Sequence, residues 1–170
     1  MKPPILLKTI LDICFVLLVF TYAATFIYFL LAVFFDIPLA IEIHERTIEN
    51  FTPATIALLL GEFVIYGVSI YIIYLLRKLV RNFFKMKFFT ELQGALLIRI
   101  GKLMVLTIIA EAVFNFFSSL ILTGKTRLVL ELEPSFNNFF VTMALGLFFI
   151  FLGKLFENAR VLREEHDLTV

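Results

Sequence analysis

The chain has 170 residues, of which 61% are hydrophobic, 16% aromatic and 17% charged, and its net charge is +1 at pH 7. Soluble domains contain roughly 45–50% apolar and about 25% charged residues, so most of this chain is expected to lie in lipid. The small net charge excludes a nucleic-acid binder driven by overall charge. The single cysteine excludes a disulfide-stapled secreted domain, and the hydrophobic content excludes an intrinsically disordered protein.

Four apolar segments are long enough to cross a hydrocarbon core of roughly 30 Å, which takes about 20 residues. Thr90 and Gln93 have the spacing of a capping box, which predicts that the third helix begins there, before its membrane part. The first apolar run is longer than the core of a cleaved signal peptide, so it is expected to be retained. The predicted spans are about 11–35, 53–76, 96–123 and 136–158, followed by a cytoplasmic helical tail at 154–170. No linker divides the chain, and the predicted fold is all-α: one domain, 1–170, with four transmembrane helices in an up-down bundle.

The positive charges are divided unequally between the two sides of this predicted bundle. Three bases fall on one side: Arg46, Lys125 and Arg127. Twelve fall on the other: Lys2, Lys8, Arg77, Lys78, Arg81, Lys85, Lys87, Arg99, Lys102, Lys154, Arg160 and Arg163. Because cytoplasmic segments hold the excess of Lys and Arg, both termini are predicted to be cytoplasmic.

The two outward loops, 36–52 and 124–135, each contain a run in which apolar and polar residues alternate. Period-two alternation predicts strands, so the loops are expected to pair as a small extracytoplasmic two-stranded β ribbon. The alternative is a ligand-sensing cap, because acidic residues outnumber bases in these loops and would attract a cation. His44 lies among the carboxylates without a second His or Cys, so no metal site and no cofactor is predicted.

Two carboxylates, Glu62 and Glu111, are predicted to lie near the middle of the membrane, where an ionisable group marks a functional site by default. Each belongs to a polar stripe at helical spacing. The predicted intramembrane cluster consists of Glu62, Tyr66, Ser69, Thr107, Glu111, Asn115 and Ser118. Three interpretations remain open: a neutral hydrogen-bonded cluster that fixes helix register, a proton or cation relay, and an enclosed ligand pocket.

The cytoplasmic side carries charged residues that would contact lipid or a protein partner. In the 77–89 segment they alternate with phenylalanines, which favours anchoring to anionic headgroups, with docking of a soluble partner as the alternative. The predicted contact residues are Arg77, Lys78, Arg81, Lys85, Lys87, Arg99, Arg160, Arg163, Glu165 and Asp167. Thr142, Gly146 and Gly153 form a small-residue face, which would pack either within one bundle or between copies in a homo-oligomer.

Three short stretches carry a family resemblance: Met86-Lys87-Phe88-Phe89-Thr90, Ile98-Arg99-Ile100-Gly101 and Glu165-His166-Asp167-Leu168-Thr169. With them the chain resembles, over nearly its whole length, a bacterial family of four-helix membrane proteins known as domain of unknown function 2975. Met86, Phe88, Ile98 and His166 depart from the family's pattern. The family has no established activity, and its members are often encoded beside small helix-turn-helix regulators.

The resemblance implies a multi-pass protein of the bacterial inner membrane. It also implies a non-enzymatic role as sensor or sequestering partner of a small DNA-binding regulator, without direct contact to nucleic acid. The chain has no Ser-His-Asp set, Cys-His pair or phosphate-binding glycine loop, so no enzyme is predicted. The alternative is a small proton- or cation-coupled transporter that uses the intramembrane glutamates.

Overall fold

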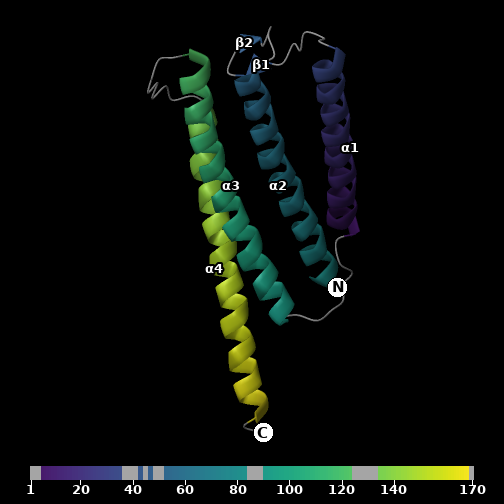
Figure 1. Ribbon diagram of the computed structural model, residues 1–170. Helices are drawn as coiled ribbons and strands as arrows, with labels where there is room; N and C mark the ends of the chain where they lie inside the picture. Colours follow the sequence, from purple (N-terminus) through teal and green to yellow (C-terminus); the bar gives the residue numbers. More distant parts are fainter. Residues whose placement is uncertain are drawn as a thin grey trace.

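The computed structural model describes residues 5–35, 42–43, 46–47, 52–83, 90–123 and 134–168. Its four helices are α1 (Ile5–Phe35), α2 (Pro53–Phe83), α3 (Glu91–Thr123) and α4 (Pro134–Leu168), and its two short strands are β1 (Glu42–Ile43) and β2 (Arg46–Thr47). The helices run up and down, so α1 begins and α4 ends at the same end of the molecule (Figure 1). The predicted all-α, four-helix fold is confirmed.

Side-chain caps define where α2 and α3 begin. Thr52 and Thr55 cap each other: each backbone N–H donates to the other's hydroxyl, at 2.9 Å and 3.3 Å, and Pro53 occupies the first helical position. At α3 the Thr90 N–H donates to Oε1 of Gln93 at 3.2 Å. The predicted capping spacing is therefore confirmed, and α3 begins at the exposed residue Glu91, before its apolar part.

The four helices form an open row. Among the described residues α1 contacts only α2, α2 contacts α1 and α3, and α4 contacts only α3 (Figure 1). Two apolar clusters join the row: Phe29, Ala32 and Leu59 between α1 and α2, and a larger one around Leu75 and Ile100 between α2, α3 and α4. The up-down order was predicted correctly, but the helices do not close around one common core.

Four glycines set the contact between α3 and α4. Gly94 lies opposite Gly153, and Gly101 lies opposite Gly146, so the pairs repeat after seven residues in both helices. A Cβ added at Gly94 would lie 3.3 Å from the carbonyl oxygen of Gly153, and one added at Gly101 would overlap the carbonyl oxygen of Gly146. Small residues allow helix backbones to approach this closely. Gly146 and Gly153 thus pack within the chain, which decides a question that their sequence pattern left open.

The glycine register displaces α4 along the molecule. Gly94 is only three residues from the start of α3, whereas α4 continues for 15 residues beyond Gly153 to Leu168. About 12 residues of α4, or roughly 18 Å, therefore project past the start of α3. Figure 1 shows this projecting segment, residues 157–168, below the ends of the other three helices.

Large apolar side chains cover the outside of the row. Phe34 is 80% exposed and Phe20 is 73% exposed. Among the described residues, three helical segments are long and apolar enough to cross a membrane: Leu6–Phe35, Pro53–Phe83 and Asn138–Glu165. The length, composition and exposed apolar surface of these helices support a membrane protein. α3, which carries Arg99, Lys102 and Glu111, is not among them.

The predicted β ribbon between the two outward loops is not supported. The two described strands both lie in the 36–52 segment and pair with each other, Glu42 with Thr47 and Ile43 with Arg46. Their close spacing in the chain makes a local hairpin the simplest pairing. Residues 124–133, which would have supplied the second strand, lie outside the described residues.

Candidate functional site

A half-open, mainly apolar pocket of about 250 Å³, here called the Glu62 pocket, lies between α1 and α2. Glu62 and Tyr66 of α2 line it together with Tyr22 and Thr25 of α1. The Tyr22 and Tyr66 rings stack with centroids 5.7 Å apart, and the Tyr22 hydroxyl donates to the backbone carbonyl of Phe63 at 3.5 Å. Glu62 therefore shares its surroundings with three hydroxyl-bearing side chains from two helices.

The α3 members of the predicted intramembrane cluster lie elsewhere. No residue of α3 lines the Glu62 pocket; Glu111 and Asn115 are exposed, and Ser118 is fully buried. The hydroxyls of Ser69, Thr107 and Ser118 each donate to a backbone carbonyl three or four residues earlier in their own helix. The structure thus brings Glu62 and Tyr66 together beside α1, where both remain exposed, and it leaves Glu111 and Asn115 exposed on α3.

An ion pair joins α1 to α2 at the end of the molecule where α1 and α3 begin and α2 and α4 end, here called the charged end. Asp12 Oδ1 lies 2.6 Å from Nε of Arg77 and 3.6 Å from a terminal nitrogen of Arg81. The Arg77 guanidinium also lies over the Phe15 ring, 4.4 Å from its centroid. Asp12 thus accepts a charge-assisted hydrogen bond from the end of another helix.

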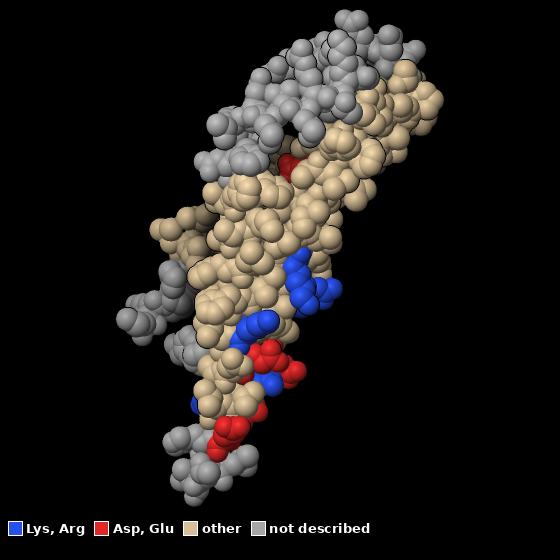
Figure 2. Space-filling model, turned by 90° about the vertical axis from the view of Figure 1, so that its left-hand side faces the viewer, with Lys and Arg blue, Asp and Glu red and all other residues tan. Residues whose placement is uncertain are grey.

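A second ion pair joins α3 to the projecting segment of α4. Arg160 lies 3.1 Å from Glu91 at the start of α3 and 3.4 Å from Glu164 one turn further along α4. Beyond this contact, Val161 and Leu162 are exposed among charged residues, and Leu162 reaches 65% exposure. Figure 2 shows the charges gathered toward this end, with an almost uncharged surface above them. The projecting segment therefore presents a mixed apolar and charged surface at the charged end.

The other predicted contact residues also lie at the charged end where the structure describes them. Lys78, Arg81, Arg99, Arg163 and Glu165 are exposed at the charged end. Lys85 and Lys87 lie outside the described residues, and Asp167 lies in the last turn of α4.

The sequence analysis did not predict three residues of these sites: Asp12 as the partner of Arg77, Tyr22 in the Glu62 pocket, and Glu91 as the partner of Arg160. A signal was present for Asp12, because it is the only acid in α1 and the up-down order sets the start of α1 beside the end of α2.

A family model described as a protein of unknown function, DUF2975, matches residues 39–170. The chain belongs to this family, which confirms the resemblance, and α1 precedes the matched region. No curated protein and no solved structure matches the chain. Two residues of the resembling stretches, Ile100 and Gly101, are buried where α3 meets its neighbours, so this stretch is part of the helix packing.

Proposed function

We propose that this member of the DUF2975 family is a non-enzymatic protein of the bacterial inner membrane that sequesters a small cytoplasmic helix-turn-helix regulator. Both termini are cytoplasmic in this proposal, so the projecting segment of α4 lies in the cytoplasm. The chain crosses the membrane four times, and α3 crosses it packed against α2 and α4. The outward loops receive a signal, and a change in helix packing releases the regulator.

The observation that carries the proposal is the projecting segment itself. Residues 157–168 continue an unbroken helix beyond the other three, with Val161 and Leu162 exposed beside Arg163 and Glu164. Apolar side chains surrounded by charges at a water-facing helix end are typical of a surface that a protein partner covers. The ion pair from Arg160 to Glu91 connects this segment to the start of α3.

The test is affinity purification from native membranes in mild detergent, followed by mass spectrometry of the proteins that co-elute. The full chain is compared with a chain that ends at Arg160, which keeps the Arg160–Glu91 contact but lacks the exposed surface. Within the full chain, Leu162→Asp is compared with the matched control Leu162→Met. We expect the full chain and Leu162→Met to retain a small DNA-binding protein, and the truncated chain and Leu162→Asp to lose it.

A recovered regulator is then purified and its binding to the chain in lipid nanodiscs is measured directly. Binding that is equally strong to the chain ending at Arg160 would contradict the proposed docking surface. If folded full-length chain retains no DNA-binding protein in any preparation, sequestration is rejected.

A proton- or cation-coupled transporter is the second candidate, and the carboxylate of Glu62 in the pocket between α1 and α2 is the observation in its favour. A relay through both glutamates is less well supported, because the lining residues of that pocket come from α1 and α2 only. Flux measured in proteoliposomes separates the two candidates. The sequestering role predicts no flux in the wild type, whereas transport predicts flux that Glu62→Gln abolishes.

A further inference from the structure

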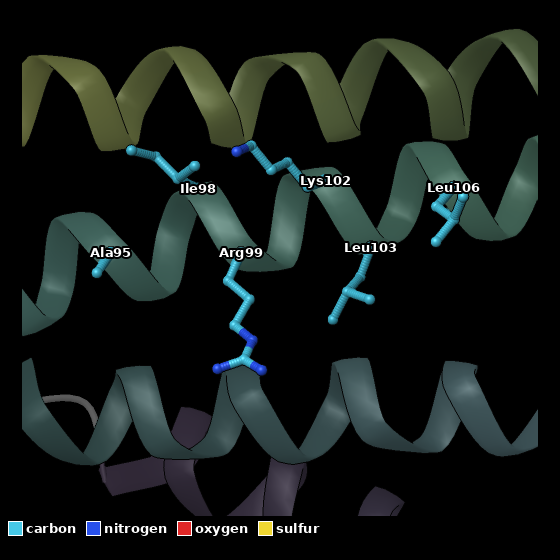
Figure 3. Close-up of a pocket in the computed structure, with 6 residues that line it drawn as sticks. All are labelled: Ala95, Ile98, Arg99, Lys102, Leu103 and Leu106. Atoms are coloured by element: carbon cyan, nitrogen blue, oxygen red, sulfur yellow. The ribbon is translucent and has the colours of Figure 1, made fainter.

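An open groove of about 470 Å³ runs along an exposed side of α3. Its lining residues are Ala95, Ile98, Arg99, Lys102, Leu103 and Leu106, one stripe at helical spacing. In Figure 3 the Arg99 side chain extends toward α2 and the Lys102 side chain extends toward α4, while the aliphatic residues lie between and beside them. The groove therefore combines two cations, one turn apart, with an apolar floor.

Unlike Arg77 and Arg160, these two cations are not neutralised by a carboxylate of the described residues. Arg77 is held by Asp12, and Arg160 is held by Glu91 and Glu164. Arg99 and Lys102 are exposed, and neither forms an ion pair or hydrogen bond with another described residue. No carboxylate lines the groove. An anion is thus the complementary ligand, and a guanidinium with an ammonium suits a phosphate group.

The position of the groove indicates that the phosphate belongs to a lipid. Leu75 and Leu79 of α2 belong to the same apolar cluster as Leu96 and Ile100 of α3, so Arg99 lies near the level of Arg77 along the helices, at the border between charged and apolar surface. Beyond Lys102 the same face of α3 is apolar, with Leu106 62% and Val113 50% exposed. A phosphate at the bases would therefore place an acyl chain along these residues.

From this geometry we infer that the groove is a binding site for an anionic phospholipid, with its phosphate at Arg99 and Lys102 and one acyl chain along Leu103 and Leu106. The selectivity follows from charge. The ammonium of a zwitterionic headgroup would meet two cations and no carboxylate, whereas phosphatidylglycerol carries the same phosphodiester without an ammonium. This inference concerns the membrane-facing surface of α3 and does not depend on the proposed regulator.

The test is native mass spectrometry of the full chain in detergent, titrated with phosphatidylglycerol or phosphatidylcholine to obtain the Kd of the first bound lipid. We expect phosphatidylglycerol to bind more tightly, and Arg99→Gln with Lys102→Gln to weaken its binding by about 30-fold, as expected for two bases near a membrane surface. The matched control is Lys78→Gln with Lys154→Gln, which removes two exposed bases outside the groove and should weaken binding much less. The variant Arg99→Lys with Lys102→Arg keeps both charges and should retain most of the binding.

A second arm tests the acyl chain. Leu106→Ser should weaken binding of phosphatidylglycerol, and glycerol phosphate at millimolar concentration should not compete with the lipid. If Arg99→Gln with Lys102→Gln and the control Lys78→Gln with Lys154→Gln weaken phosphatidylglycerol binding equally, the attraction is diffuse and the proposed site is overturned. Competition by glycerol phosphate would show a phosphate site without lipid recognition and would also overturn the inference. Near-native circular dichroism and a single elution peak exclude misfolding of the variants.

Discussion

Asp12 shows how one charged residue can connect two membrane helices at their ends. Its carboxylate accepts a 2.6 Å hydrogen bond from Arg77, whose guanidinium also lies against the Phe15 ring of α1. Both charged side chains are partly exposed, at 31% for Asp12 and 16% for Arg77, so their surroundings screen the pair. The contact therefore acts mainly by fixing how the start of α1 lies against the end of α2.

Replacing Asp12 with Asn should lower the melting temperature of the chain in detergent. The reason is that Arg77 loses its charged partner while remaining mostly covered by neighbouring side chains. The measurement is a double-mutant cycle by thermal unfolding, with Asp12→Asn, Arg77→Gln and the double variant. The double variant should melt at a higher temperature than the sum of the two single effects predicts. Strict additivity would show that the pair contributes nothing to the α1–α2 contact.

At the scale of elements, the contact between α3 and α4 depends on glycines, whose lack of a side chain lets the two backbones approach closely. Lipid provides no hydrophobic force between helices, so the helices associate by close van der Waals packing. At Gly101 and Gly146 the backbones are so close that an added Cβ has no space on either side. The same contact determines the register of α4, and with it the length of the projecting segment.

The variant Gly101→Ala should destabilise the protein by about 1–3 kcal/mol, because the new Cβ forces the two backbones apart. The matched control is Gly67→Ala, where the nearest atom to the added Cβ is the Tyr22 hydroxyl oxygen at 3.6 Å, an ordinary contact distance. This control should cost no stability, since alanine is favoured over glycine in a helix. Unfolding by titration with a denaturing detergent measures both. Equal stability of the two variants would contradict the close α3–α4 packing.

At the scale of the whole molecule, the open row is the feature that distinguishes this fold from a closed bundle. Helices in contact lie about 8–10 Å apart, so three successive contacts separate α1 from α4 much more than they separate α1 from α2. In a closed bundle, α1 would instead be a neighbour of both α2 and α4. The difference is large enough to measure in a lipid bilayer.

Spin labels should detect this arrangement. With Cys14 replaced by Ser, labels are introduced at Phe20→Cys on α1 with either Val64→Cys on α2 or Phe140→Cys on α4, all at exposed positions. We expect the α1–α4 distance from pulsed electron paramagnetic resonance in nanodiscs to exceed the α1–α2 distance by about 10–20 Å. Dilution with unlabelled chain removes signals between molecules. Two similar distances would mean that the bundle closes.

The sequence alone determined the environment, the helices and some of their ends. Lipid demands apolar residues over whole helix lengths, so composition revealed the four long helices, and the Thr90–Gln93 spacing located the start of α3 because caps are local. The family resemblance seen in three short stretches is confirmed by the family model that matches residues 39–170. Each of these results depends on residues that lie close together in the chain.

Only the tertiary structure decided how the helices face one another. Glu62 and Glu111 each belong to a polar stripe, but a helix that is apolar on most sides gives little indication of which side meets a neighbour. The structure places Glu62 beside Tyr22 and Thr25 of α1 and Glu111 away from them on α3, with both glutamates exposed. It likewise paired Arg77 with Asp12 and left Arg99 without an ion pair among the described residues. Pairing of this kind depends on the register between neighbouring helices, such as the one that Gly101 and Gly146 set between α3 and α4. Such registers depend on atoms far apart in the chain, and therefore appear only once the helices are packed.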